Sequence, residues 1–247
     1  MERETEPGIL VPDWPAPAWV RAAQSPRQGG VSKPPYASLN LAEHTGDEPG
    51  AVAENRRRLH RHLALPAEPS WLQQVHGTAV VPAGAPGARA DASWCDRPGQ
   101  VCVVMTADCL PVLLCDTAGS VVAVAHAGWR GLLGGVLEAA VAAMQRPAGS
   151  LLAWLGPAIG PDAFEVGEEV RAQFVAADAA AAQCFRPSPR GRWLADLYAL
   201  ARQRLQRVGV EAIYGGGFCT VRQAEQFFSY RRDGRTGRMA TLIWLQD

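Results

Sequence analysis

The amino-acid sequence predicts a single mixed α/β domain in which mixed β-sheets are layered against helices. Short apolar runs of β-forming residues alternate with helical segments along the whole chain. No internal repeat or clear linker divides it, and 247 residues can bury a substantial core. We expect residues 1–12 to form a tail or edge segment and residues 13–247 to form one catalytic domain.

The first third of the chain predicts more loop than regular structure. Residues 13–35 are rich in proline and glycine, so we expect a loop with a short strand at 19–20. A helix over 49–65 is predicted because Pro49 suits a first turn and apolar residues then recur at roughly helical spacing. Short apolar runs predict strands at 71–75 and 79–81, followed by a loop to residue 90.

The rest of the chain alternates strands and helices more regularly. Runs of valine, leucine and isoleucine predict paired strands at 101–105 and 111–115, then strands at 121–125, 151–155, around 213 and at 239–245. Helices are predicted at 132–144, 166–177 and 194–208, the last stopped by Gly209.

Composition excludes several classes of protein. A formal net charge of zero argues against a nucleic-acid binder that works by bulk attraction. No apolar run approaches the ~20 residues that span a bilayer, and the first residues have no apolar signal core. Six cysteines scattered through apolar runs do not form a disulfide framework. We therefore expect a cytoplasmic protein with reduced thiols that binds neither nucleic acid nor membrane.

Three side chains at predicted strand ends could form a metal site. Cys109 and His126 follow the strands predicted at 101–105 and 121–125, and His76 follows 71–75 in the same way. Cys102 and Cys115 lie inside apolar runs and are best interpreted as core residues. Each candidate alone is commonly structural, but two histidines and a cysteine on zinc leave a fourth position open, as in catalytic sites.

Two further stretches allow a functional and a structural interpretation. Backbone N–H groups and an arginine at 129–131 could bind an anion, although a tight turn with a surface arginine explains the pattern equally simply. The aromatic and then basic run 227–238 could hold a planar base and an anion, or could form a solvated hairpin.

Several of these blocks, in their order along the chain, resemble the laccase-domain family, also called YfiH-like. This family was once labelled multicopper polyphenol oxidases and is now mostly described as purine nucleoside phosphorylases. The resemblance runs from about residue 12 to 245 and is carried by the blocks Gln74–Gly77, Ala90–Ala92, Thr106–Leu114, His126–Gly131, Gly156–Pro161, Phe164–Gly167, Cys219–Thr220 and Phe227–Gly234.

The resemblance implies a YfiH-like fold with one zinc ion, Zn²⁺, held by His76, Cys109 and His126. It implies phosphorolysis of adenosine, inosine and related nucleosides, with some adenosine deamination, so the partners are a small-molecule nucleoside and phosphate. We expect a monomer. The remaining candidates are Asn40, Arg56, Asp108 and Arg130 for catalysis, with the two arginines holding phosphate, and Gly128, Trp129 and Phe228 for substrate binding.

Three other functions stay open at the level of sequence. Some relatives are described as peptidoglycan editing factors, which would make this chain an amidase that removes a wrong amino acid from a cytoplasmic UDP-muramyl precursor, with Cys109 as ligand or nucleophile. A zinc-stabilised binding module would need a fourth ligand. The older laccase label is disfavoured because five histidines cannot supply four copper ions, although adventitious copper could enter the zinc site.

Overall fold

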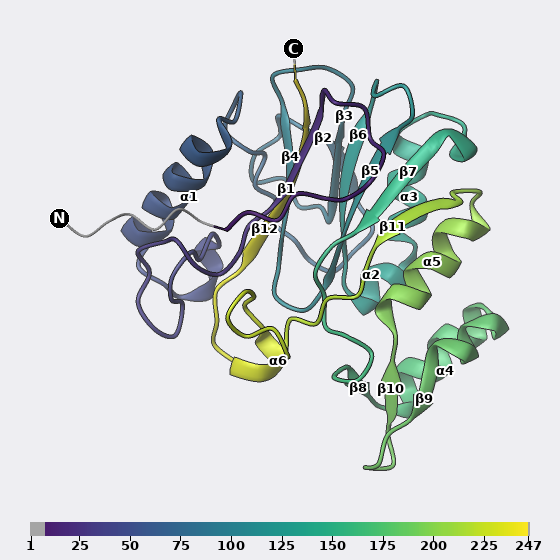
Figure 1. Ribbon diagram of the computed structural model, residues 1–247. Helices are drawn as coiled ribbons and strands as arrows, with labels where there is room; N and C mark the ends of the chain where they lie inside the picture. The colour runs from purple at the N-terminus through teal and green to yellow at the C-terminus, as the bar shows by residue number, and fades with distance from the viewer. Residues whose placement is uncertain (1–7, 247) are drawn as a thin grey trace.

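The computed structural model describes residues 8–246 and contains two β-sheets packed face to face between helices (Figure 1). The first sheet is antiparallel, in the order β1–β12–β4, with strands Val20–Gln24, Met239–Leu245 and Val101–Thr106. The second sheet is mixed, in the order β11–β7–β5–β6–β3–β2, with strands Ala212–Gly215, Leu151–Leu155, Leu110–Asp116, Val122–Ala127, Ala92–Cys95 and Val80–Pro82.

Helices cover the outer face of each sheet. Helix α1, Pro49–Leu63, lies against the first sheet. The second sheet is covered by α2, Trp129–Gly134, α3, Val136–Ala143, and α5, Leu197–Arg207. The protruding arm at the lower right of Figure 1 contains α4, Glu168–Ala177, and the small sheet β8–β10–β9, with strands Glu165–Val166, Trp193–Ala195 and Phe185–Pro187. The remaining short elements are α6, Tyr230–Asp233, and the 3-10 helices Glu43–Thr45, Ala148–Ser150 and Ala179–Cys184.

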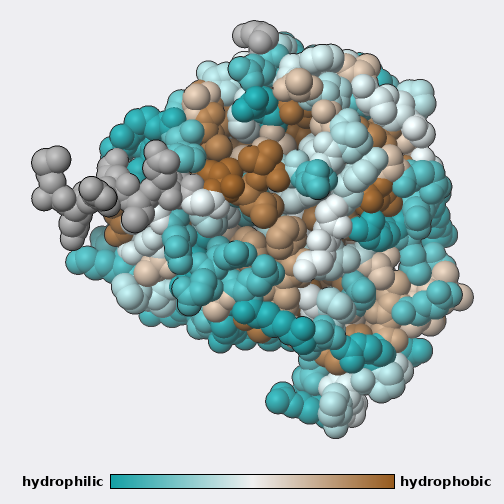
Figure 2. All heavy atoms as spheres, viewed as in Figure 1, coloured by the Kyte–Doolittle hydropathy of each residue, from teal (hydrophilic) through white to brown (hydrophobic). Residues whose placement is uncertain are grey.

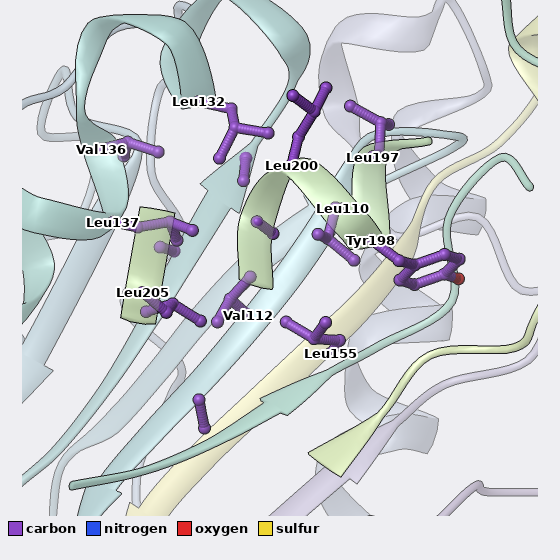
Figure 3. Packing of buried hydrophobic residues seen from close by; sticks show 14 of the residues in the cluster. Leu110, Val112, Leu132, Val136, Leu137, Leu155, Leu197, Tyr198, Leu200 and Leu205 are labelled. Atoms are coloured by element: carbon purple, nitrogen blue, oxygen red, sulfur yellow. The ribbon is translucent and has the colours of Figure 1, made fainter. Parts of the chain in front are cut away.

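The alternation of side chains along the strands explains the layers. In β4, Val101 and Val103 point toward the layer of α1, whereas Cys102 and Val104 point between the two sheets. In β5, Leu110 and the next alternate side chains pack under the helices on the other side, as Figure 3 shows. Both sheets are therefore apolar on both faces, which matches the continuous apolar runs in the sequence.

Several predicted elements are confirmed. Helix α1 begins at the predicted Pro49, and β7 and β12 span the predicted residues. The helix predicted at 132–144 is instead two helices, because Gly135 adopts φ 102° between them. The helix predicted from residue 194 begins at Leu197, since Asp196 caps it by accepting the backbone N–H of Ala199 at 2.9 Å.

Two strand predictions are wrong. Residues 71–75 form no strand, because the Gln74 side chain takes the place of a backbone ladder and bonds both the N–H and the carbonyl of Met105, at 2.7 and 2.8 Å. The strands predicted at 101–105 and 111–115 do not pair with each other. They are β4 and β5 of different sheets, so the turn between them crosses from one layer to the next.

The surface is mixed in character. On the face in Figure 2, apolar side chains gather over the segment that precedes β1, where Val11 is 72% exposed, while the arm is mostly polar. No helix within residues 8–246 is long and apolar enough to cross a membrane. Of the predicted tail at 1–12, residues 1–7 lie outside the described residues, and Leu10 pairs with Gln24 of β1.

Candidate metal centre

The fold brings His76, Cys109 and His126 together at the edge where β4 and β6 end and β5 begins. Their ligand atoms all lie within 4.8 Å of one another, and Cys109 Sγ is 3.8 Å from His76 Nε2. The two imidazole rings meet edge to face at a centroid distance of 4.8 Å. Three nitrogen and sulfur donors therefore converge on one point, an arrangement that could hold a metal ion.

The strand register explains why the cysteine meets the second histidine. Leu110 of β5 pairs with Ala127 of β6, so Cys109 and Gly128 follow at neighbouring positions beyond the ladder. His126 is opposite Pro111 and lies inside β6, not beyond its end as the sequence predicted. The third ligand, His76, comes from the irregular segment between α1 and β2.

Asp91 holds the His76 turn. Its buried carboxylate accepts the backbone N–H groups of Val75, His76 and Gly77 at 3.1, 2.9 and 2.7 Å. His76 has φ 59°, a left-handed conformation that is unusual for a residue other than glycine and is stabilised here by these bonds. The carboxylate therefore fixes both the position and the backbone conformation of one candidate ligand.

The same carboxylate orients His126. Asp91 Oδ1 is 2.8 Å from His126 Nδ1, and both side chains are almost completely buried. With Nδ1 bonded to the carboxylate, Nε2 is the nitrogen left to a metal ion, which is the usual carboxylate–histidine–metal arrangement. Asp91 was not among the candidates predicted from sequence, although it lies in the matching block Ala90–Ala92; an aspartate 14 residues beyond Gly77 carries no local signal of this contact.

The charges of the centre favour a thiolate. Burial alone would raise the pKa of Cys109, but the charge and hydrogen bonds of His126 and His76 outweigh it and lower that pKa to about 6. Burial would lower the pKa of His126, but the Cys109 thiolate and the Asp91 carboxylate raise it to about 9. Burial would raise the pKa of Asp91, and its bonds from His126 and Gly77 lower it instead. The cysteine is therefore already in the form that ligates metals.

Gly128 leaves room for the side chains of His76 and Cys109. A Cβ atom built on Gly128 would lie 2.8 Å from His76 Cδ2 and 3.0 Å from Cys109 Sγ, so any side chain there would push against two of the three donors. The backbone φ of Gly128 is −64°, so the position requires glycine for space and not for conformation.

We expect Gly128→Ala to weaken metal binding about tenfold or more, because the new methyl group must displace a ligand from its position. Metal content after purification and a competition titration with a chelator would measure this. Gly134→Ala is a matched control, since its Cβ would meet only the Thr78 methyl group at 3.1 Å. Equal metal affinity in the two variants would contradict the steric role of Gly128.

Asp108, Trp129 and Arg130, candidates from the sequence for catalysis and substrate binding, are next to the centre along the chain. Asp108 precedes Cys109 with φ 93°, and its carboxylate oxygens accept the Thr220 hydroxyl and the Arg231 N–H, each at 2.6 Å. Asp108 therefore ties the C-terminal loop to the centre and has little capacity left for a substrate. Arg130 is exposed at the start of α2, and its guanidinium lies 4.3 Å from the centroid of the Trp129 ring.

The side chain of Asn40 is hydrogen-bonded entirely to other protein groups. Its buried amide donates to the Ala42 carbonyl, the Thr45 hydroxyl and the Asp47 carboxylate, at 2.9–3.2 Å, and its carbonyl accepts from Ala42 N–H and Arg238 N–H. Both ends of the amide thus bind protein, which leaves Asn40 without a free hydrogen-bonding group for a substrate.

Arg56 and Phe228 also differ from their predicted roles. Arg56 donates from Nε to the Leu41 carbonyl, pairs through Nη1 with Glu43 at 2.8 Å and lies over the Trp71 ring at 4.1 Å, so two of its three nitrogens and one face are already in use. Phe228 is completely buried and cannot stack on a ligand, whereas Tyr230, two residues later, is 62% exposed. The aromatic run therefore buries two rings, Phe227 and Phe228, and exposes one, Tyr230, which residue type alone does not reveal.

The chain is therefore a mixed α/β protein with a centre of two histidines and one cysteine. These three side chains could together bind a metal ion. The chain belongs to the family described as multi-copper polyphenol oxidoreductase laccase, whose model matches residues 21–246.

Relatives of known name match nearly the whole chain. A Pseudomonas aeruginosa protein named purine nucleoside phosphorylase PA4543 is 59% identical over 240 residues, which are 96% of this chain and 98% of that protein. The Escherichia coli K12 protein named purine nucleoside phosphorylase YfiH is 58% identical with the same coverage. The crystal structure of Neisseria meningitidis protein NMB0706 matches with a TM-score of 0.93 and 52% identity, over 97% of this chain and 99% of that one. The structure of YlmD from Geobacillus stearothermophilus matches at 30% identity with a TM-score of 0.84, over 93% of each chain.

Proposed function

We propose that this chain is a zinc-dependent purine nucleoside phosphorylase that converts adenosine, inosine and related nucleosides plus phosphate into a free base and ribose-1-phosphate. The observation that carries the proposal is the centre of three donors, which no fourth His, Cys, Asp or Glu joins within residues 8–246, in a chain close to 60% identical to proteins named for this activity. We further propose that it works as a cytoplasmic monomer.

The chemistry of the donor set fits zinc, since thiolate and imidazole are usual protein ligands of zinc. With Zn–S and Zn–N bonds of about 2.3 and 2.1 Å, tetrahedral geometry places sulfur and nitrogen about 3.6 Å apart. The observed 3.8 Å between Cys109 Sγ and His76 Nε2 is close to that value. A zinc ion held there would supply a Lewis acid that stabilises negative charge on an oxygen atom of the reactants.

Phosphorolysis needs an anion beside a sugar and a base. Phosphate oxygen adds at the ribose C1′ while the C1′–N bond breaks and the base leaves with a proton. Arg130 is one candidate to hold phosphate, since it is exposed next to Gly128 and has no carboxylate partner among residues 8–246. Trp129 beneath it and Val75, 39% exposed beside His76, offer apolar contacts for a base or sugar.

The histidine inventory supports a single metal ion and not a multicopper oxidase. Of the five histidines in the sequence, only His76 and His126 belong to a group of donors that could hold a metal ion in the part of the chain that the structure describes. A trinuclear copper cluster with an additional blue-copper site needs more imidazole than this.

The proposal is tested by incubating the zinc-loaded protein with adenosine or inosine, with and without inorganic phosphate. We expect free base and ribose-1-phosphate only when phosphate is present, and loss of both products in Cys109→Ala but not in His62→Ala, a histidine variant on the exposed face of α1. No base release from any purine nucleoside in the presence of phosphate would refute the proposal.

The same incubations separate the other candidate activities. Inosine formed from adenosine without phosphate would establish the additional deaminase activity that we propose for the same centre. Release of an amino acid from a UDP-muramyl precursor, with nucleosides left intact, would favour the editing amidase. Copper-dependent oxidation of a phenol as the sole activity would restore the laccase label.

A further inference from the structure

Arg238 lies beside the metal centre although it is distant from it in sequence. It immediately precedes β12, and Met239 pairs with Thr106, the last residue of β4. The turn that carries Cys109 begins directly after Thr106, and Arg238 directly precedes Met239. Because Met239 and Thr106 are paired, Arg238 lies next to that turn. No feature of residue type distinguishes it from the neighbouring arginines of the basic run 231–238.

The backbone and side chain of Arg238 are held by protein. Its N–H donates to Asn40 Oδ1 at 2.9 Å, and its Nη1 donates to the carbonyls of Thr236 and Gly237 at 2.9 and 3.0 Å. The guanidinium also lies 5.9 Å from the centroid of the Tyr230 ring. One end of the guanidinium is thus fixed, while Nε and Nη2 have no protein acceptor among the described residues.

Arg238 is half-buried yet lacks an ion pair within residues 8–246. Two other half-buried arginines have one: Arg56 pairs with Glu43 at 2.8 Å and Arg204 with Glu138 at 2.5 Å. Arg27 and Arg202 are half-buried without an ion pair among these residues, but each donates from both Nη atoms to backbone carbonyls. A sheltered charge without a counter-ion is costly, and arginine stays protonated in proteins. Such a position is therefore suited to an anion that arrives from solution.

The nearest negative groups belong to the metal centre and do not neutralise Arg238. Burial lowers the pKa of the Arg238 guanidinium, and the charges of Cys109 and Asp108 are the first to oppose that effect. Asp108, however, already accepts hydrogen bonds on both oxygens, from Thr220 and Arg231. The Cys109 thiolate is the candidate metal ligand. The free nitrogens of Arg238 are therefore within electrostatic range of the centre and without a partner of their own.

We propose that Arg238 binds the phosphate co-substrate at the rim of the metal centre, donating from Nε and Nη2 to two phosphate oxygens. The fork geometry of a guanidinium matches two oxygens of one phosphate group, and a side chain already fixed at Nη1 loses less entropy on binding. Phosphate as the anion rests on the proposed phosphorolysis. Arg130 is exposed, and the Trp129 ring is its one side-chain contact recorded within residues 8–246, so it is not pre-oriented in this way.

The test is a calorimetric titration of the zinc-loaded protein with inorganic phosphate. We expect Arg238→Met to weaken phosphate binding about 10- to 100-fold, the loss of a charge-assisted pair of hydrogen bonds, and to raise the KM for phosphate by the same factor with the KM for nucleoside unchanged. Arg235→Met is the matched control from the same loop, since Arg235 donates to the Tyr36 hydroxyl at 3.0 Å, and it should bind phosphate normally.

Unchanged phosphate affinity in Arg238→Met, or no phosphate binding by the unmodified protein, would overturn the proposal. If Arg238→Met does not fold, Arg238→Lys is the second test, because lysine keeps the charge but loses the fork. We expect about a tenfold loss of phosphate affinity in Arg238→Lys, and an unchanged affinity overturns the assignment. Phosphate binding that depends on Arg238 without phosphorolysis would refute the proposed function alone. Phosphorolysis that is indifferent to Arg238 would refute this inference alone.

Discussion

His126→Ala is expected to abolish metal binding and to lower the free energy of unfolding of the metal-free protein by about 3 to 5 kcal/mol. The metal loss follows because only two donors of the candidate centre remain. The loss of stability follows because the Asp91 carboxylate, buried completely, loses the imidazole that donates to it at 2.8 Å. Metal analysis and urea unfolding of chelator-treated protein measure the two effects separately.

His76→Ala is the matched comparison, since it removes the other histidine of the centre. Its ring is exposed, and the bonds that hold this turn come from backbone N–H groups that alanine keeps. We therefore expect metal loss with a change in unfolding free energy of less than about 1 kcal/mol, much smaller than for His126→Ala. Equal destabilisation by the two variants would contradict the division between a buried, oriented ligand and an exposed one, and full metal occupancy in either would remove that residue from the ligand set.

Asp91→Asn is expected to weaken metal binding about 10- to 100-fold, because the residue that orients His126 and holds the His76 turn loses its charge. It should also lower the free energy of unfolding by about 2 to 6 kcal/mol, since an amide NH₂ replaces one oxygen and leaves two buried donors unpaired at ~1 to 3 kcal/mol each. In the native protein those two donors are the N–H groups of Val75 and Gly77 or of His76 and the His126 ring, depending on the amide orientation.

Asp116→Asn is the control for Asp91→Asn. Asp116 is also buried and accepts the N–H groups of Ser120 and Val121 and the Ser120 hydroxyl, but it holds a turn between β5 and β6 at the opposite end of these strands from the centre. It should destabilise the fold and leave metal affinity unchanged. If both variants lose metal affinity equally, the loss in Asp91→Asn results from lower overall stability. The proposed role of Asp91 in orienting the ligands would then be wrong.

The pH dependence of Asp91 has a definite sign. Because its pKa is lowered in the folded protein, its contribution to stability is present above the unfolded value of ~3.9 and is lost as the pH falls through the lower folded value. Metal-free protein should therefore lose stability on acidification below about pH 4, and Asp91→Asn should lose less over the same range. Parallel acid curves for the two proteins would show that the carboxylate is not held in its charged form.

Strand content and the candidate ligands were accessible from sequence, because both depend on local pattern. Continuous apolar runs identified β5, β7 and β12, and the interruption of such a run at Asp108 separated Cys109 from the core residues Cys102 and Cys115. The pairing of the strands could not be predicted from the sequence, because β4 and β5 are equally apolar and their connection crosses from one sheet to the other. Residues 71–75 have the apolar pattern of a strand, but they form none. The Gln74 side chain instead bonds the backbone N–H and carbonyl of Met105, where a neighbouring strand would have bonded them.

By itself, the sequence predicted the class of fold from apolar periodicity, and it predicted the family and the three candidate donors His76, Cys109 and His126 from specific motifs and the family resemblance that they carry. Only the tertiary structure decided how these donors are held and which other side chains reach them. Asp91 acts through contacts with two separate segments, and Arg238 reaches the centre through the pairing of β12 with β4. The physical reason is that hydrogen bonds and unpaired charges depend on distances between residues far apart in the chain, which no local pattern encodes.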